Sequence, residues 1–356
     1  MDKAILDLYS DYLVSSFGAT TATGLSELLD GAVSHDQITR SLAKKKAGSK
    51  EIWQIAKPYV RQVEDKSGVL IVDDSIEEKA YTDENEHICW HYDHSKDRQV
   101  KGINFISLLY HSQGVSLPIG FVLVTKTETY EDAKTGKTKR RSTVTKNEHY
   151  RQMIKQAVQN QVEFSYVLND IWYAAVENMK FIKQELKKDF IMPLKSNRKV
   201  AVSQDAKRKG KYVGIEAVDI KSECIKPIYL EGVEFPLLLA KQIFTNEDGS
   251  IGILYLVTSD TSLTYERITT IYQKRWKVEE YHKSLKQNVS LSKSPTQTIN
   301  SQTNHFFAAL WGYIKLEVLK LQSKQNHFAL KSKLYIQALK QAFAAWQSLK
   351  PSQLSA

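Results

Sequence analysis

The pattern of hydrophobic and polar positions divides the 356-residue chain into regions with helix-like spacing of apolar residues and regions with strand-like apolar runs. Residues 1–66 place apolar side chains at helical spacing and contain no strand-like run, which predicts a helical region. Residues 67–195 hold continuous apolar runs mixed with helical patterns, and residues 196–260 hold short strand-like runs. Helical patterns return over residues 261–322 and 323–356. We therefore predict an α/β protein with helical regions at both ends.

The order of elements in the central region is informative. Apolar runs at 68–73, 104–110 and 119–125 predict three strands of an antiparallel meander. After them the pattern predicts, in order, a helix at 147–161, a strand at 164–168, a helix at 174–187 and a strand at 190–194. Three strands followed by helix, strand, helix and strand is the order of a ribonuclease-H-like core. We expect a mixed sheet covered by helices.

Residues 196–260 interrupt this pattern, and we interpret them as a β-rich insertion in the core. Strand-like runs occur at 212–218, 226–229, 235–243 and 252–257, with a hairpin turn expected at Glu247-Asp248-Gly249-Ser250. The chain then returns to helical patterns at 264–287, 298–322 and 330–349. The first of these belongs to the second part of the core, and the last forms a C-terminal helical tail.

The N-terminal region has the outline of a helix-turn-helix. Residues 23–29 and 35–46 predict two short helices, separated by a break at Gly31, and Ser34 is a plausible N-cap of the second helix. In a helix-turn-helix the second helix enters the major groove of DNA, which would place Arg40 near the bases. Because any helical hairpin gives the same pattern, simple helical packing is the alternative.

Charge points to a polyanionic partner. The net charge is +10 and the pI about 9.2. The bases are clustered: residues 40–50 hold five bases and no acid, residues 134–146 hold six and no acid, and residues 195–211 hold seven against Asp205 alone. Such runs are candidate phosphate contacts, although solvated surface is the alternative. The last run contains the DNA-binding candidates Lys207, Arg208, Lys209 and Lys211.

Other classes of protein are disfavoured by composition. No apolar run approaches the roughly 18 residues of a membrane-spanning helix, so we expect no membrane association. The N-terminus lacks a basic start followed by an apolar stretch, which argues against a secretory signal. Cys89 and Cys224 are the only cysteines, too few for a disulfide framework. We therefore expect a cytoplasmic protein.

One predicted helix carries a distinctive set of side chains. At about 100° per residue, Tyr272, Arg275, Glu279 and Lys286 fall within an arc of roughly 60° on one helix face. A carboxylate flanked by two bases and a tyrosine suits an enzyme that holds a metal ion with the acid and a DNA phosphate with the bases. The alternative is a surface helix with ordinary salt bridges.

This spacing, Y-x2-R-x3-E-x6-K, resembles the signature of DDE transposases of bacterial insertion sequences, of the IS-four type. The resemblance spans residues 66–320 and implies that Glu279 is the third metal-binding carboxylate of a ribonuclease-H-like core. It also implies that the first acid is Asp74, which ends an apolar run before a hydroxyl residue, and that the second is Asp170. Asp73 is the competing first acid, because neighbours on a strand point to opposite faces.

Three acids drawn from distant parts of the chain suit phosphodiester cleavage. Two Mg²⁺ ions, about 3.5–4 Å apart, activate water and relieve charge at the scissile phosphate, and carboxylate oxygens suit Mg²⁺, with Mn²⁺ as a substitute. The resemblance implies binding of double-stranded DNA at terminal inverted repeats, hydrolysis to free a 3′-hydroxyl, and its attack on target DNA by a homodimer. The alternatives are a regulator that no longer cuts and a nuclease that never joins.

Two further groups of residues suggest a function but also fit an ordinary structural role. A possible zinc cluster lies in what we expect to be one polar loop: His87, Cys89, His91 and His94. The close spacing matches no standard tetrahedral site, which favours ordinary loop residues. Trp172 and Tyr173 follow Asp170 directly, where stacking on an unpaired base competes with packing in the core.

Overall fold

The computed structural model of the protein describes residues 2–93, 96–133, 135–246 and 248–349. His94, Lys134 and Glu247, which belong to features expected above, lie outside the described residues, as does the end of the tail at 350–356. The chain forms two compact units. We call residues 56–279 the sheet unit, and residues 1–55 together with those from 280 onward the helical unit.

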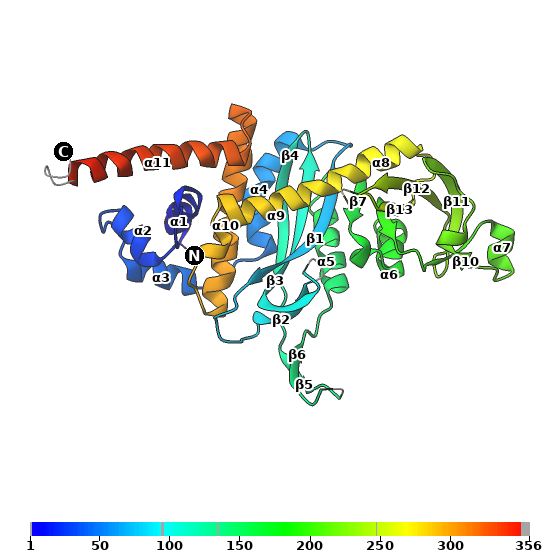
Figure 1. The fold of residues 1–356 in the computed structure, drawn as a ribbon, viewed down its shortest axis with the longest axis horizontal. Coiled ribbons are helices and arrows are strands. Elements are labelled where there is room, and N and C mark those ends of the chain that lie inside the picture. The colour runs from blue at the N-terminus through cyan, green and yellow to red at the C-terminus, as the bar shows by residue number, and fades with distance from the viewer. Residues whose placement is uncertain (1, 94–95, 134, 247, 350–356) are drawn as a thin grey trace. The chain divides into compact units, whose positions relative to one another are not determined.

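The sheet unit is built on one 11-stranded mixed sheet, so the predicted α/β class is confirmed. Strand β1 pairs antiparallel with the long strand β3, while on its other side it pairs parallel with β7, which in turn pairs parallel with β8. Strands β2 and β4 pair with opposite ends of β3 (Figure 1). These strands are β1 (Val69–Glu78), β2 (Ile88–Asp93), β3 (Arg98–Ser112), β4 (Val115–Leu123), β7 (Tyr166–Asn169) and β8 (Asp189–Leu194).

The strands after β8 extend the same sheet. The order continues from β8 through β13, β12, β11 and β9 to β10. These strands are β9 (Lys199–Ala201), β10 (Val213–Gly214), β11 (Cys224–Leu230), β12 (Leu237–Thr245) and β13 (Ile251–Thr258). The expected strand at 212–218 is wrong over most of its length, because only two residues pair and a 3-10 turn, Ile215–Ala217, follows.

Two of the helices expected in the sheet unit are interrupted by irregular turns. The expected helix at 174–187 is a short α-helix that continues as a π-helix, and the expected helix at 264–287 is broken by a 3-10 turn. The elements are α5 (Lys146–Gln159), η1 (Ile171–Tyr173), α6 (Val176–Lys180), η2 (Phe181–Glu185), α7 (Gln204–Arg208), α8 (Tyr265–Gln273), η4 (Lys274–Trp276) and α9 (Lys277–Asn288). Helix α9 continues from the sheet unit into the helical unit.

The region expected to be one polar loop is instead strand β2. His87, just before β2, is buried, as are Cys89 and His91 on the strand, whereas Trp90 and Tyr92 are exposed. The prediction was wrong because the buried face of this strand carries polar and sulfur side chains, so hydrophobic alternation is not visible in the sequence. A small separate hairpin follows β4 and is formed by β5 (Glu128–Glu131) and β6 (Thr138–Arg141).

The helical unit joins the start of the chain to its end. Its helices are α1 (Lys3–Ser15), α2 (Ala22–Leu28), α3 (His35–Ala43), α10 (Ile299–Ser323) and α11 (His327–Leu349), with α4 (Ser49–Val63) leading into the sheet unit. The two short helices predicted near the N-terminus are confirmed as α2 and α3, and Ser34 caps α3 with a reciprocal bond to Gln37. Helices α1 and α3 both pack on α10.

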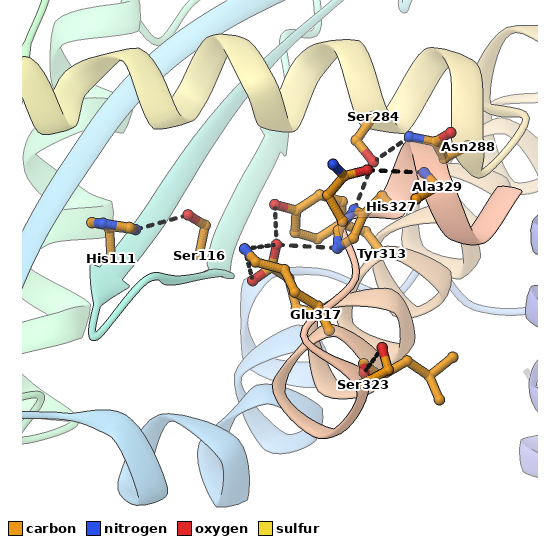
Figure 2. A network of polar contacts seen from close by, with 12 residues as sticks. His111, Ser116, Ser284, Asn288, Tyr313, Glu317, Ser323, His327 and Ala329 are labelled. Atoms are coloured by element: carbon orange, nitrogen blue, oxygen red, sulfur yellow. Dashed lines mark hydrogen bonds and ion pairs between the residues drawn. The ribbon is translucent and has the colours of Figure 1, made fainter. Parts of the chain in front are cut away.

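Buried polar side chains tie α9, α10 and α11 together in the helical unit, as Figure 2 shows. The Oγ of Ser284 lies 2.8 Å from Nδ1 of His327, whose Nε2 lies 3.1 Å from the Glu317 carboxylate. Tyr313 donates to the same carboxylate at 3.2 Å. All four side chains are buried, so this arrangement links the three helices and is closed to a substrate. Among the described residues, no helix is both long and apolar enough to cross a membrane.

Candidate active site

Parallel pairing of β1 with β7 brings two aspartates together. Val72 on β1 lies opposite Asn169, the last residue of β7. The next residue of each strand is an acid, Asp73 and Asp170. Equivalent positions on paired parallel strands point to the same face of the sheet, so these two carboxylates share a face. Asp170 also accepts a hydrogen bond from the backbone N–H of Trp172 at 2.9 Å, which fixes its carboxylate.

The third acid comes from α9. Carboxylate oxygens of Asp73 and Glu279 lie within 4.8 Å of each other. Arg275, in the 3-10 turn that precedes α9, places Nη1 3.4 Å from Oε1 of Glu279. The Arg275 side chain is 13% exposed and that of Glu279 is 48% exposed, so the base is held within the protein while the acid remains open to solvent. Asp73 thus lies near one acid that directly follows β7 and one acid on α9.

The electrostatics of Asp73 reflect this crowding. Burial raises the pKa of Asp73 well above its ordinary value, and the neighbouring carboxylates of Asp170, Asp74 and Glu279 raise it further. Burial also raises the pKa of Asp170. Carboxylates that are crowded together and only partly compensated by Arg275 form a site that a divalent cation would stabilise.

Asp74 has the opposite environment. It lies on the other face of β1, where its carboxylate accepts hydrogen bonds from Lys146 at 2.7 Å, Asn104 at 2.7 Å and Tyr173 at 2.8 Å. Burial alone would raise the pKa of Asp74, but the Lys146 ammonium and these donors lower it below its ordinary value. Asp74 is close enough to Asp170 to raise the pKa of that acid. Asp73, and not Asp74, has a carboxylate oxygen within 4.8 Å of Glu279. The metal-binding role expected for Asp74 stays a prediction.

The other residues of the expected signature are spread over three elements. Tyr272 belongs to α8, and its hydroxyl lies 3.4 Å from the carbonyl oxygen of Asn169, beside Asp170; burial raises the pKa of this phenol. Arg275 belongs to the 3-10 turn. Lys286 lies on the part of α9 that belongs to the helical unit. The 60° arc assumed an uninterrupted α-helix, and the 3-10 turn changes this geometry.

The basic DNA-binding candidates differ in their exposure and in whether their charged groups already contact other residues. Arg40 is exposed on α3. On and after α7, Lys207 donates to the carbonyl oxygens of Val233 and Glu234 at 2.9 and 2.8 Å, and Lys209 pairs with Asp205 at 2.8 Å. Two candidates are exposed and have no such contact with the residues that the structure describes: Arg208 and Lys211.

Two groups near the site were not predicted correctly or at all. Cys89 and His91 are buried side by side on β2, with Sγ 3.4 Å from Nε2. Burial lowers the pKa of His91 to about 3, so the ring is neutral.

Lys146 and Asn104, which hold Asp74, were missed because no local spacing connects them with β1. Trp172 is 50% exposed while Tyr173 is buried, so only Trp172 is open to a ligand.

Two family models match the chain. The model described as DDE superfamily endonuclease matches residues 2–214, and the model described as Transposase DDE domain matches residues 131–314. The first match contains Asp73, Asp74 and Asp170, and the second contains Asp170 and Glu279. No curated protein matches the chain. Each of the two models covers more than half of the chain, and the crowded acids lie within their combined span. The chain therefore belongs to the DDE superfamily of endonucleases and transposases.

Proposed function

We propose that the protein is a metal-dependent DNA transposase whose metal-binding carboxylates are Asp73, Asp170 and Glu279. The observation that carries this proposal is the placement of both Asp170 and Glu279 beside Asp73. Asp73 replaces Asp74 in the set expected from the sequence, because Asp74 points to the other face of β1 and is already paired with Lys146. Asp74 then acts as a positioning residue.

The residues present fit a divalent metal. The donors are carboxylate oxygens, which hard cations such as Mg²⁺ prefer, and their crowding raises the pKa of Asp73 in the absence of a cation. DDE domains are typically dependent on divalent metals. Bound Mg²⁺, or Mn²⁺ in its place, would supply charge neutralisation at the scissile phosphate and activation of water, and two ions are expected.

The remaining residues orient the acids and the substrate. Arg275 contacts Glu279 and faces the acids, so its guanidinium is placed to steady Glu279 and to bind a phosphate oxygen. Tyr272 reaches the end of β7 and supports the position of Asp170. Lys286, farther along α9, is proposed as an additional phosphate contact.

The wider reaction follows from the transposase assignment. We propose that the protein binds terminal inverted repeats of an insertion sequence of the IS-four type, with Arg40 on α3 among the contacts. It would cleave to free a 3′-hydroxyl and join this hydroxyl to target DNA as a homodimer. A metal-dependent nuclease that does not join is the second candidate, because the same acids would serve hydrolysis alone.

The matched pair Asp73→Asn and Asp74→Asn tests the site. The substrate is a plasmid carrying the coding region with its flanking DNA, and both cleavage and joined products are measured with Mg²⁺ or Mn²⁺. We expect Asp73→Asn to lose cleavage by several orders of magnitude and Asp74→Asn to lose roughly 10–100-fold, as is typical of groups that position ligands. Cleavage that survives in Asp73→Asn would overturn the assignment. Cleavage without joined products would favour the nuclease.

A further inference from the structure

We propose a second phosphate site in the sheet unit, a basic pocket centred on Arg198 that binds a backbone phosphate of DNA other than the one being cleaved. The inference rests on the proposed function, which supplies the DNA. The pocket lies where the chain turns from β8 into β9, beside the end of β11. It is separate from the three carboxylates and uses none of them.

Two neighbouring cavities define the pocket. The first has a volume of about 370 Å³, within the range of roughly 300–1,000 Å³ that is common for ligand sites. The second, of about 200 Å³, shares Lys195 and Arg198 with the first and reaches Trp172, two residues after Asp170. The backbone N–H of Trp172 donates to the Asp170 carboxylate at 2.9 Å, so the second cavity begins beside the acid cluster, as a DNA strand crossing both would require.

Arg198 is held in place with part of its guanidinium unsatisfied. Its backbone N–H donates to the carbonyl oxygen of Lys195 at 3.1 Å, and its carbonyl accepts from the N–H of Ile215 at 2.8 Å. The Nη2 atom is buried, yet it has no hydrogen-bond partner among the described residues. A buried charged donor without an acceptor costs stability, and a phosphate oxygen entering the pocket would satisfy it.

The charges around Arg198 favour an anion. Lys195 and Lys199 line the first cavity with it, against one acid, Glu231. Among the residues that the structure describes, none of these three bases forms an ion pair with an acid. Lys195 instead places Nζ 4.2 Å from the centre of the Trp172 ring, which leaves its charge available to a ligand. By contrast, Lys209, directly after α7, is paired with Asp205.

The salt dependence of DNA binding tests the pocket. Affinity for a fluorescent random-sequence duplex is measured over a range of salt for wild type, Arg198→Gln and Lys209→Gln. The last variant removes one positive charge that is already paired with Asp205. Loss of one phosphate contact should lower the slope of log affinity against log salt by about 0.9 in Arg198→Gln. Lys209→Gln should leave the slope close to that of wild type.

Three additional measurements test whether Arg198 itself contacts a DNA phosphate. Arg198→Lys should keep most of the slope, since the charge is retained, and circular dichroism checks that Arg198→Gln folds. Single phosphates of the duplex are also replaced by neutral methylphosphonates. At one position this replacement should lower the DNA affinity of the wild-type protein. At the same position it should not lower the affinity of Arg198→Gln any further. Inorganic phosphate that competes with wild type alone would show that a free anion occupies the pocket.

The outcomes separate this inference from the proposed function. An unchanged slope in a folded Arg198→Gln protein, or methylphosphonate effects equal in both proteins, would overturn the pocket. Cleavage by Asp73→Asn would overturn the proposed metal site but leave the slope difference in place. The two failures are therefore distinguishable.

Discussion

Asp73 and Asp74 are neighbours on one strand, yet their surroundings differ in every respect that matters for chemistry. Asp73 faces two other acids, whereas Asp74 faces Lys146, Asn104 and a phenol. The pleat of β1 produces this difference, because consecutive side chains point to opposite faces. One face of the strand collects negative charge that a cation would neutralise, and the other is already neutralised by the protein.

Glu279 and Glu280 are a second pair of neighbours that substitution should separate. Glu279 contacts Arg275 and lies beside Asp73, while Glu280 is rotated by about 100° along the helix. Glu279→Gln keeps the size of the side chain but removes its charge, so cleavage should fall by several orders of magnitude while DNA binding survives. Glu280→Gln should retain cleavage within a few-fold. The two proteins are compared on DNA that is already bound, and similar rates would contradict the role of Glu279.

His91 makes a prediction about pH and stability. Burial, with the nearby Lys126 and Lys146 ammonium groups, lowers the pKa of His91 from 6.5 to about 3 against the opposing charge of Asp74. Between these two pH values His91 is protonated in the unfolded chain but neutral in the folded chain. The free energy of unfolding therefore falls as the pH drops from 6.5 towards 3. One such proton contributes a slope of up to about 1.4 kcal/mol per pH unit.

Replacing His91 by Gln should remove this contribution. Urea unfolding of wild type and His91→Gln at several pH values between 4 and 7 measures the difference in slope. The variant loses some stability at every pH because its contact with Cys89 changes, so the slope and not the absolute value carries the test. Parallel pH profiles for the two proteins would show that His91 is not the group responsible.

Some of these residues carry local signals in the sequence and others carry none. The resemblance points to Asp170 after an apolar strand and to Glu279 on a helix with a distinctive spacing, and both lie near Asp73 in the structure. Their metal-binding roles stay predictions. The choice between Asp73 and Asp74 depends on the register between β1 and β7, which places Asp73 level with Asp170. This register is fixed by pairing between segments about a hundred residues apart. Lys146 and Asn104 reach Asp74 only through the tertiary fold, so no spacing reveals them.

At the scale of elements, periodicity predicts the regular helices and the central strands but not the interruptions. The π-helix after α6 and the 3-10 turn after α8 keep ordinary helical composition, so the sequence gives no sign of them. The 3-10 turn matters because it sets the direction in which Arg275 meets Glu279. Strand β2 was missed for a related reason, since its buried face carries His91 and Cys89 in place of aliphatic residues.

The short helix α7 shows how contacts revise an expectation based on charge. Four bases on and after it were expected to bind DNA, but Lys207 holds two backbone carbonyls and Lys209 is paired. We expect Arg208→Gln with Lys211→Gln to weaken DNA binding and to lower its salt slope. Lys207→Gln should instead lower the melting temperature, because two hydrogen bonds to backbone carbonyls are lost. Duplex titrations over salt and thermal unfolding measure both, and a full slope in the double variant would show that α7 is solvated surface.

The N-terminal helices are a second case at this scale. A separable DNA-binding region would leave a folded core when residues 1–66 are removed. Helices α1 and α3 pack on α10, however, and Asn304 of α10 donates to the carbonyl oxygens of Leu42 and Lys44. Deletion should therefore expose the apolar face of α10 and cause aggregation or loss of helix content by circular dichroism.

A point substitution tests DNA recognition without this damage. Arg40→Ala removes an exposed side chain of α3 and should keep the fold. It should weaken binding to the flanking DNA of the coding region more than binding to random duplex. Equal loss on both would reduce Arg40 to a phosphate contact, and a soluble, folded deletion protein would show that the region is independent after all.

For the molecule as a whole, the acid cluster is a place where folding and metal binding should be coupled. Asp73, Asp170 and Glu279 come from widely separated positions of the sheet unit, so the unfolded chain cannot hold them together. A cation that binds only the folded protein stabilises it by mass action, by about 2.7 kcal/mol at a concentration one hundred times its dissociation constant. We expect Mg²⁺ to raise the melting temperature of the wild-type protein in a concentration-dependent way.

Two variants make this prediction specific. Asp73→Asn should melt higher than wild type without metal, since it removes one of the crowded charges that raise the pKa of this group, and should gain little from Mg²⁺. Asp74→Asn should melt lower without metal, because Lys146 loses its partner, but should still gain from Mg²⁺. Thermal unfolding at constant ionic strength separates site binding from general salt effects. If all three proteins gained equally, Mg²⁺ would act on the surface at large and the cluster would not be its site.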